Sequence, residues 1–190
     1  MSLQNLKIPT PTPNESPSAK SLISSLSLTP HPEGGYFIRT HTNPLTIPSP
    51  FPGQVGETRP LSTSIFYLLT PHSPIGHFHK NRSLIVHTAV RGRGRYVLVH
   101  ESGKVETFVV GCDVEKGDVA QWVVEGGVWK GSMLGEGVGE LLITEVAVPG
   151  FDFSDHEFMA KGRLADIVGL EAAEELSPML RSEDQGLISS

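Results

Sequence analysis

The chain has 190 residues, of which 20 are Gly and 15 are Pro, and only 19% are charged. This length suits one domain, and the many turn-forming residues favour a protein built from short strands. The net charge of −6 excludes the sustained basic surface that nucleic acids and anionic membranes require. We therefore expect neither nucleic acid nor membrane as a partner, and a small or cationic partner remains open.

The N-terminal residues and the cysteine content indicate where the protein works. Cys112 is the single cysteine, so no intramolecular disulfide can form. The first 18 residues lack the continuous apolar region of a secretory signal, and no stretch approaches the roughly 18 apolar residues of a membrane span. The sequence predicts a cytoplasmic protein and leaves the nucleus open as a second compartment.

The predicted organisation is a single domain over residues 19–180 between two flexible tails, 1–18 and 181–190. The first tail is rich in Pro, Ser and Thr, and has too little apolar surface to order itself. A short helix is predicted for Ala19–Leu28, where apolar residues recur along one side. The Pro-rich stretch Asn43–Pro60 is interpreted as a long loop between strands.

The middle of the chain alternates between short β-rich runs and turn signals. Gly92-Arg93-Gly94-Arg95 is interpreted as one of these turns, a basic hairpin turn. Strands at spacings of about 8–12 residues indicate a sandwich or barrel. Near the C-terminus, Glu171–Leu180 suits a surface helix that Pro178 ends or kinks. The predicted strands are Tyr36–Thr40, Ser62–Leu69, Ser83–Val90, Arg95–His100, Val105–Val110, Val119–Val124, Val128–Leu134 and Leu141–Val148.

Two short segments carry residues suited to chemistry. His77 and His79 flank Phe78, and alternation along a strand predicts that both imidazoles lie on one face, where they could chelate a metal. An ordinary structural role for this pair is the alternative. The second segment places Glu33, Tyr36 and Arg39 around a glycine turn, with a solvated arginine as its plainer interpretation.

Several motifs in order carry a resemblance to a known family. These are Leu28–Phe37 (LTPHPEGGYF), Ser64–Leu69 (SIFYLL), Phe78–Lys80 (FHK), Gln121–Trp129 (QWVVEGGVW) and Val148–Phe153 (VPGFDF). The span from Ala19 to Leu180 resembles the small single-domain cupins catalogued as a domain of unknown function, also called the cupin-5 group, and looks closest to a fungal branch. The resemblance implies an all-β double-stranded β-helix jelly roll with short flanking helices, a homodimer, and a pocket inside the barrel mouth.

The resemblance also bears on metal binding. Cupins that hold a metal commonly use His-x-His, a Glu four or five residues later, and a final His from a second motif. His77 and His79 match the first pair, but Ser83 and Leu84 stand where the acid would fall, and Lys130 stands at the final His position. An ammonium there would repel a divalent ion, so we expect no metal and no other cofactor. If a metal did bind, a third ligand would be sought among Glu33, His87 and His100.

Metal-free relatives of this kind include sugar-nucleotide epimerases, in which His and Tyr side chains move protons next to a carbonyl. The resemblance implies a small-molecule-binding protein, with metal-independent isomerisation or epimerisation of a carbonyl-bearing metabolite, such as a nucleotide sugar, as the favoured activity. A non-catalytic binding or storage-like protein and a vestigial metal-dependent oxygenase are the alternatives, so enzyme and binding protein both stay open. The catalytic candidates are His77, His79, Tyr36 and Lys130. The expected ligand-binding residues are Glu33, Tyr36, Arg39, His77, His79, Trp129 and Lys130.

Overall fold

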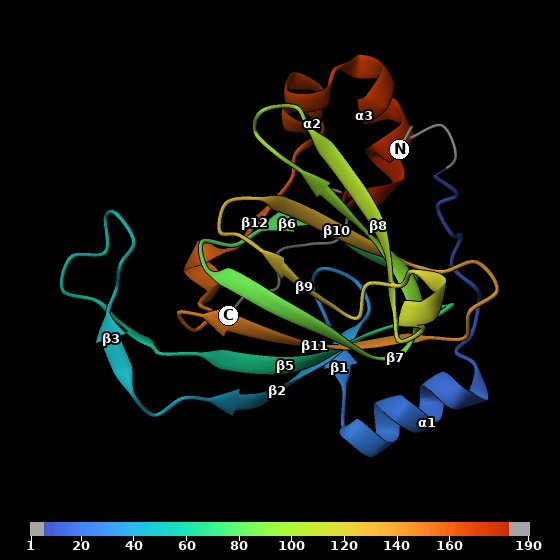
Figure 1. The fold of residues 1–190 in the computed structure, drawn as a ribbon, viewed down its shortest axis with the longest axis horizontal. Coiled ribbons are helices and arrows are strands. Elements are labelled where there is room, and N and C mark those ends of the chain that lie inside the picture. The colour runs from blue at the N-terminus through green and yellow to red at the C-terminus, as the bar shows by residue number, and fades with distance from the viewer. Residues whose placement is uncertain (1–5, 183–190) are drawn as a thin grey trace.

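The structure is a computed structural model that describes residues 6–182. Its centre is a curled antiparallel sheet, with helix α1 at one end and helices α2 and α3 at the other (Figure 1). The helices are α1 (Pro17–Leu26), α2 (Lys161–Val168) and α3 (Leu170–Leu176), with 3₁₀ turns η2 (Val114–Lys116), η3 (Phe153–Asp155) and η4 (Ser177–Met179). The strands are β1 (Thr29–Pro30), β2 (Tyr36–Thr42), β3 (Thr46–Pro48), β4 (Thr58–Pro60), β5 (Thr63–Leu69), β6 (Ile75–Lys80), β7 (Leu84–Val99), β8 (Val105–Gly111), β9 (Gln121–Val124), β10 (Trp129–Leu134), β11 (Leu141–Val148) and β12 (Glu157–Phe158).

The long strand β7 joins the two halves of the sheet. The hydrogen-bonded order is β1-β2-β5-β11-β7-β10-β6-β12, and β8 and β9 also pair with β7. The first part of β7 pairs with β11 and β9, and its second part pairs with β10 and β8. Because one strand belongs to both halves, the sheet curls into a barrel whose interior is lined from two sides.

The predicted hairpin turn at Gly92-Arg93-Gly94-Arg95 is wrong, because β7 runs through it. The two strands predicted on either side of it, Ser83–Val90 and Arg95–His100, form one strand. Gly92 has a φ of 81°, and a Cβ there would lie 1.7 Å from the carbonyl oxygen of Glu140. Glycine is therefore used to bend a continuous strand beside its neighbour, since only a residue without a Cβ fits this approach.

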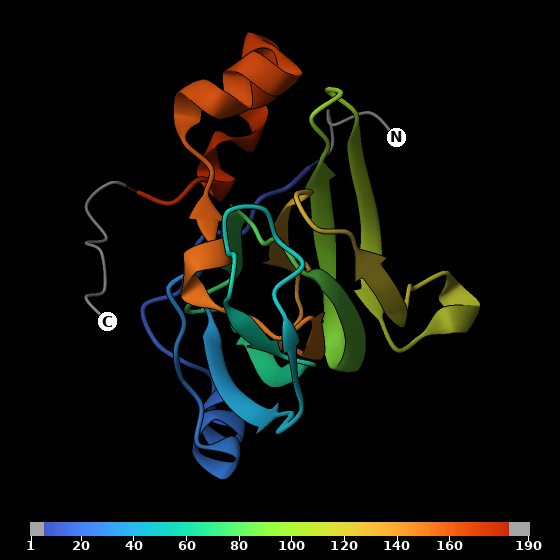
Figure 2. The same cartoon turned by 90° about the vertical axis from the view of Figure 1, so that its left-hand side faces the viewer.

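The remaining elements differ from the prediction mainly at their ends. The loop predicted for Asn43–Pro60 contains the small β3–β4 hairpin, which projects away from the helices at the left of Figure 1 and crosses the front of Figure 2. The helix predicted for Glu171–Leu180 ends at Leu176 and continues as η4, which contains Pro178. Helix α2 was not predicted from the sequence.

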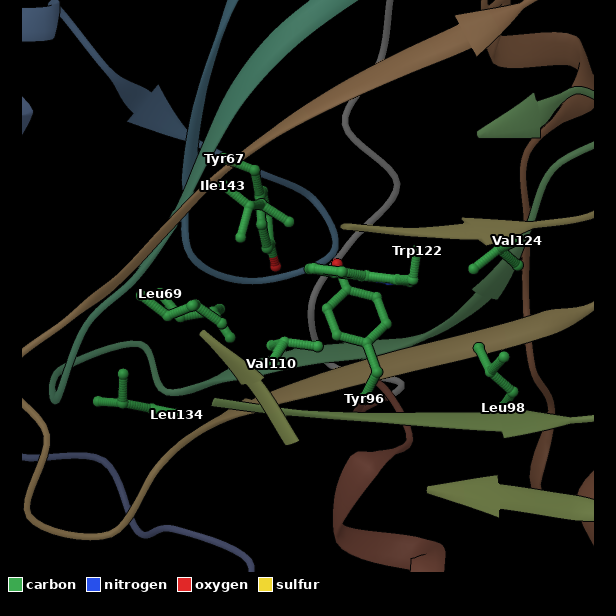
Figure 3. Close-up of a cluster of buried hydrophobic side chains, with 10 residues drawn as sticks. Tyr67, Leu69, Tyr96, Leu98, Val110, Trp122, Val124, Leu134 and Ile143 are labelled. Atoms are coloured by element: carbon green, nitrogen blue, oxygen red, sulfur yellow. The ribbon is translucent and has the colours of Figure 1, made fainter. Parts of the chain in front are cut away.

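Two apolar cores lie on opposite faces of the curled sheet. The first fills the barrel, where side chains from β5 and β11 meet those from β7, β8 and β9 (Figure 3). The second lies between the outer face of β6, β7 and β10 and the C-terminal helices. The barrel core comprises Tyr67, Leu69, Tyr96, Leu98, Val110, Trp122, Val124, Leu134, Leu141 and Ile143. The outer core includes Phe78, Val97, Val99, Trp129, Met133, Leu164, Leu176 and Met179.

The segment before α1 lies along the barrel. Leu6 and Ile8 pack against the outer core, and the Thr12 amide donates a 2.8 Å hydrogen bond to the carbonyl of Pro71. The Glu15 carboxylate accepts hydrogen bonds from the hydroxyls of Tyr36 and Thr70, each at 2.8 Å. The sequence predicts flexible tails at residues 1–18 and 181–190. Of these residues, 1–5 and 183–190 lie outside the part of the chain that the structure describes. Within residues 6–182, no helix is long and apolar enough to cross a membrane.

Candidate functional site

A cavity of about 50 Å³ opens from the barrel interior to the surface. A water molecule needs roughly 10–15 Å³ of such space, so the cavity holds about three or four waters. Ionisable side chains lie next to apolar ones around it, which is typical of a ligand site. Its lining consists of His31, Glu33, Phe37, Arg39, Thr63, Ile65, Asn81, Ile85, Glu145, Ala147, Phe151 and Phe153.

A tight turn between β1 and β2 places Glu33 inside the barrel. Gly34 follows it with a φ of 96°, and a Cβ at Gly34 would lie 2.1 Å from the carbonyl oxygen of Ile75. Only glycine accommodates this close approach at a positive φ. The Glu33 carbonyl accepts a 2.6 Å hydrogen bond from the amide of His77, which fastens the turn to β6.

Glu33 is the centre of a buried histidine cluster. Its Oε1 lies 2.8 Å from Nε2 of His156 and 3.2 Å from Nε2 of His79, and its Oε2 lies 3.7 Å from Nδ1 of His31. Burial alone would raise the pKa of Glu33, but the neighbouring histidines, with His79 first and His31 second, hold it well below its usual value. Glu33 is therefore a carboxylate at neutral pH.

His79 is neutral, and the position of its ring proton follows from its neighbours. The pKa of His79 is lowered to about 3, mainly by burial and also by the charges of Lys130 and His156, against the opposing effect of Glu33. Its Nδ1 lies 2.8 Å from the carbonyl oxygen of His77. Because a carbonyl only accepts hydrogen bonds, Nδ1 carries the proton and Nε2 presents a lone pair.

A second buried group lies beside this cluster. The Lys130 ammonium donates hydrogen bonds to Oε2 of Glu145 and to Nε2 of His87, both at 2.9 Å. The pKa of His87 is well below its usual value because of burial first and the Lys130 charge second. His87 therefore accepts from Lys130 as a neutral ring, and it stacks on Trp122 with ring centroids 5.1 Å apart.

A β-bulge separates the two histidines of the His-x-His motif. The register between β6 and β10 shifts between Lys130↔His79 and Ser132↔Gly76, so β6 contains one extra residue there. His79 lies against Glu33, whereas the His77 imidazole interacts with the backbone of Met179 and with the charge of Arg181. The prediction that strand alternation puts both rings on one face is wrong here, because a bulge interrupts alternation.

The structure also places the other predicted site residues. Glu33, Arg39, His79 and Lys130 come together in or beside the cavity. Tyr36 lies elsewhere, with its hydroxyl on Glu15 and its ring among residues that contact α1. Trp129 is fully buried in the outer core, under the helices, and its indole donates to Glu101. Neither Tyr36 nor Trp129 lines the cavity.

Sequence reasoning missed His31, Glu145 and His156 as site residues. Glu145 lies on β11 among apolar residues, and a buried carboxylate inside an otherwise apolar strand (LLITEVAV) is a signal that could have found it. His31 belongs to the motif that carries the family resemblance, directly before the glycine turn. His156 follows η3 with no motif around it, and only the fold brings it to Glu33.

Comparison with known proteins shows to which family the chain belongs. Residues 20–159 match the family model described as Cupin superfamily (DUF985). The chain belongs to this cupin family. The uncharacterized protein YML079W of Saccharomyces cerevisiae is 47% identical over 182 residues, which cover 90% of each chain.

Solved structures of other proteins share the fold. A hypothetical protein from Leishmania major superposes with a TM-score of 0.76 at 24% identity, over 89% of this chain and 100% of its own. A protein from Shewanella oneidensis gives 0.74 at 23% identity, over 87% of this chain and 98% of its own. The jelly-roll fold with short flanking helices and the family resemblance are both confirmed.

The usual cupin metal positions do not fit a metal in this chain. Of the His-x-His pair, only His79 reaches the Glu33 cluster, and the final position is Lys130, whose ammonium is already paired with Glu145. A second set of donors does exist outside these positions. Glu33, His79 and His156 each offer one ligand atom, and the three atoms lie within 4.8 Å of one another.

Proposed function

We propose that this cupin binds a small molecule in its barrel cavity and moves a proton on it, as a metabolite isomerase or epimerase acting next to a carbonyl. The observation that carries the proposal is the position of Glu145, a buried carboxylate that lines the cavity and is held by Lys130 at 2.9 Å. A carboxylate beside a cation, at a cavity that can enclose the reacting part of a small molecule, has the parts needed for proton abstraction next to a carbonyl.

The hydrogen bonds of Glu145 leave one oxygen for a ligand. Lys130 occupies Oε2, and Oε1 accepts no hydrogen bond from residues 6–182. A general base must be within hydrogen-bond reach of the proton that it takes, and Glu145 lines the cavity in which a ligand would lie. The Lys130 ammonium next to it would stabilise the negative charge of an enolate.

The lining of the cavity indicates what kind of molecule enters. Arg39 offers a cation to a carboxylate or phosphate, and it is exposed, as expected of a residue at a mouth. Oδ1 of Asn81 is buried and has no hydrogen-bond partner in the described part of the chain, so it can accept from a hydroxyl. Phe151 and Phe153 add apolar surface. An anionic molecule with hydroxyl groups, such as a nucleotide sugar, suits this lining.

The size of the cavity limits how much of such a ligand is enclosed. Space for about three or four waters takes a small carbonyl-bearing portion. The rest of a nucleotide sugar would remain at the mouth, near Arg39. This arrangement encloses the reacting carbon beside Glu145 and leaves the charged group in partial contact with water.

Binding is tested first, with a panel of nucleotide sugars, sugar phosphates and keto acids. A ligand at 100 times its Kd adds about 2.7 kcal/mol to the folded state, which is readily measured as a rise in Tm. The Arg39→Ala variant should weaken binding of the anionic compounds. A panel in which no compound stabilises the protein would count against any ligand of this class.

Catalysis is tested with the compounds that bind. An isomerase that abstracts a proton exchanges it with solvent, so NMR in D₂O should show deuterium entering the carbon next to the carbonyl. Glu145→Gln should bind the ligand but lose the exchange by at least ~100-fold, as expected for a general base. Glu140→Gln is the matched control, because Glu140 is a buried carboxylate paired with Arg91 at 2.8 Å outside the cavity. Binding without exchange in the wild type would indicate a non-catalytic binding protein.

A further inference from the structure

The cluster around Glu33 combines donors from three distant segments of the chain. Glu33 comes from the turn before β2, His79 from β6 and His156 from the residue after η3. Both Glu33 and His79 are buried, with exposed fractions of 7% and 4%. Two imidazole nitrogens and a carboxylate are a donor set that zinc and non-haem iron use in proteins.

The contact between Glu33 and His79 leaves a buried nitrogen unsatisfied. Nδ1 of His79 lies 2.8 Å from the carbonyl oxygen of His77, which accepts its hydrogen bond. Nε2, the other ring nitrogen, lies 3.2 Å from Oε1 of Glu33, yet it is a buried atom without a hydrogen-bond partner in the described structure. An unsatisfied polar atom in the interior is costly. A cation bound between Nε2 and Oε1 would give this nitrogen a partner.

The other atoms of His79 are arranged as in a metal ligand. Histidines that bind metals usually donate their second ring nitrogen to a carbonyl or carboxylate, which fixes the tautomer and the ring orientation. His79 makes this hydrogen bond with the His77 carbonyl at 2.8 Å. The backbone carbonyl of His77 thus orients the His79 ring.

The spacing of the three donor atoms is close to that of a metal site. The Glu33 oxygen lies 2.8 Å from the His156 nitrogen and 3.2 Å from the His79 nitrogen. Metal–ligand distances of about 2.0–2.2 Å in a tetrahedral zinc site place ligand atoms roughly 3.3–3.5 Å from one another. Outward movements of a few tenths of an ångström would accommodate the ion, with His156 presenting its Nε2 lone pair.

We propose that Glu33, His79 and His156 bind one divalent transition-metal ion, with zinc as the ion that the donor set fits. This site does not use the cupin positions occupied by Ser83, Leu84 and Lys130, from which the sequence predicted no metal. Three protein ligands leave a fourth position for water or for a ligand, as in catalytic zinc sites. Glu33 lines the cavity, so an anionic or carbonyl oxygen entering there reaches the same carboxylate.

Zinc titration of the full chain tests this site. After dialysis against a chelator, isothermal titration calorimetry with Zn²⁺ should give one equivalent bound. The Glu33→Gln, His79→Gln and His156→Gln variants should each weaken binding at least tenfold. His100→Gln is the matched control, because His100 is also a histidine paired with a carboxylate, Glu106 at 2.7 Å, but lies outside the cavity lining and the donor set, and the affinity of this variant should stay within about threefold of the wild type.

A second measurement needs no variant and covers the case in which a variant fails to fold. In the wild type, ¹⁵N NMR should show that Zn²⁺ shifts Nε2 of two imidazoles while Nδ1 of His79 keeps its proton. Co²⁺ in place of zinc should give the visible absorption of a tetrahedral site. No zinc binding to the folded wild type at 100 µM, or equal binding by His156→Gln, would overturn the proposal. The proposed proton transfer is measured separately, on ligands, so its failure leaves the zinc measurement standing and the reverse also holds.

Discussion

The ammonium of Lys130 and the carboxylate of Glu145 form an ion pair at 2.9 Å in the barrel interior, where their side chains are 4% and 10% exposed. The pair joins β10 to β11 across the width of β7, which lies between them in the sheet. Removing one member would leave the other charge buried alone. An ion pair in this position therefore has a larger effect on stability than a surface pair does.

Lys130→Met should lower the free energy of unfolding by about 3–5 kcal/mol, because Glu145 would remain as an uncompensated buried carboxylate. The double variant Lys130→Met/Glu145→Gln should recover a large part of this loss, since no lone charge remains. Urea unfolding of both proteins measures the difference. Lys7→Met is the control, because the Lys7–Glu136 pair is more than three-quarters exposed and should change stability by less than ~1 kcal/mol. Equal losses at Lys7 and Lys130 would contradict this account.

Gly34→Ala should destabilise the protein more than Gly117→Ala does. Both glycines have a positive φ, 96° and 87°, so both substitutions introduce backbone strain of about 1–2 kcal/mol. At Gly117 the new Cβ has no atom within 4 Å, whereas at Gly34 it would lie 2.1 Å from the carbonyl oxygen of Ile75. The turn must then move and take Glu33 with it.

Urea midpoints of the two alanine variants provide the comparison, and the expected difference is at least ~2 kcal/mol. Zinc titration of Gly34→Ala gives an independent measure, since displacement of Glu33 should weaken the metal site while Gly117→Ala leaves it intact. If the two variants were equally stable, the close approach at Gly34 would not be what fixes Glu33.

The strand pattern and the family motifs were enough to predict the fold, but not the path of β7. Glycines beside arginines at 91–95 have the composition of a hairpin turn, and composition does not distinguish a turn from a bend within one strand. The bend can be recognised only from the contact between Gly92 and the backbone of Glu140, because that contact leaves no room for a side chain at position 92. The path of β7 is determined by long-range packing, which the local sequence does not reveal.

The candidate site was predictable where a residue belonged to a motif. Glu33 precedes a glycine turn, His79 belongs to the His-x-His pair, and Lys130 stands at the final His position of the second cupin motif. All three lie in the buried clusters. His77 was misplaced because a one-residue bulge reverses the alternation after it. Trp129 neighbours Lys130 in sequence, yet consecutive strand residues point to opposite faces, so it packs in the outer core.

The homodimer expected from the family resemblance remains a prediction, and the outer edge of β2 is where we place the contact. β1 pairs only with Tyr36 and Phe37, so beyond them β2 has no strand on that edge within the described chain. Residues 39–42 are exposed there. An open edge pairs readily with a second copy about a two-fold axis, where each strand meets its own equivalent.

Light scattering should give a mass near twice 20.5 kDa. Thr40→Lys/Thr42→Lys places like charges opposite each other across the two-fold axis and should raise the dissociation constant at least tenfold. Val114→Lys, at a residue 61% exposed on η2, is the control and should leave the dimer intact. A monomeric mass at micromolar concentration would exclude the dimer, and an unchanged dimer in the double variant would exclude this edge.

Stability should fall as the pH falls below about 6.5, because the barrel interior holds neutral histidines. The pKa of His79 is lowered to about 3 and that of His87 well below its usual value, in both cases mainly by burial. Between the unfolded value of ~6.5 and these folded values, the unfolded chain binds protons that the folded chain does not. Each such histidine lowers the free energy of unfolding by up to about 1.4 kcal/mol per pH unit. The pKa of Glu33 is held well below 4.5, so this carboxylate lowers the free energy of unfolding further as the pH falls below 4.5.

Urea unfolding at pH 7.5, 6.5, 5.5 and 4.5, in the presence of a chelator so that no metal contributes, measures this slope. His79→Gln should retain its fold, and its free energy of unfolding should depend less steeply on pH. Between pH 6.5 and 4.5 the slope should correspond to one proton fewer taken up on unfolding, because the imidazole that takes up this proton is gone. Stability that is constant from pH 7.5 to 4.5 would mean that these rings accept protons inside the fold, and the Nε2 of His79 would then carry the proton that its contact with Glu33 otherwise lacks.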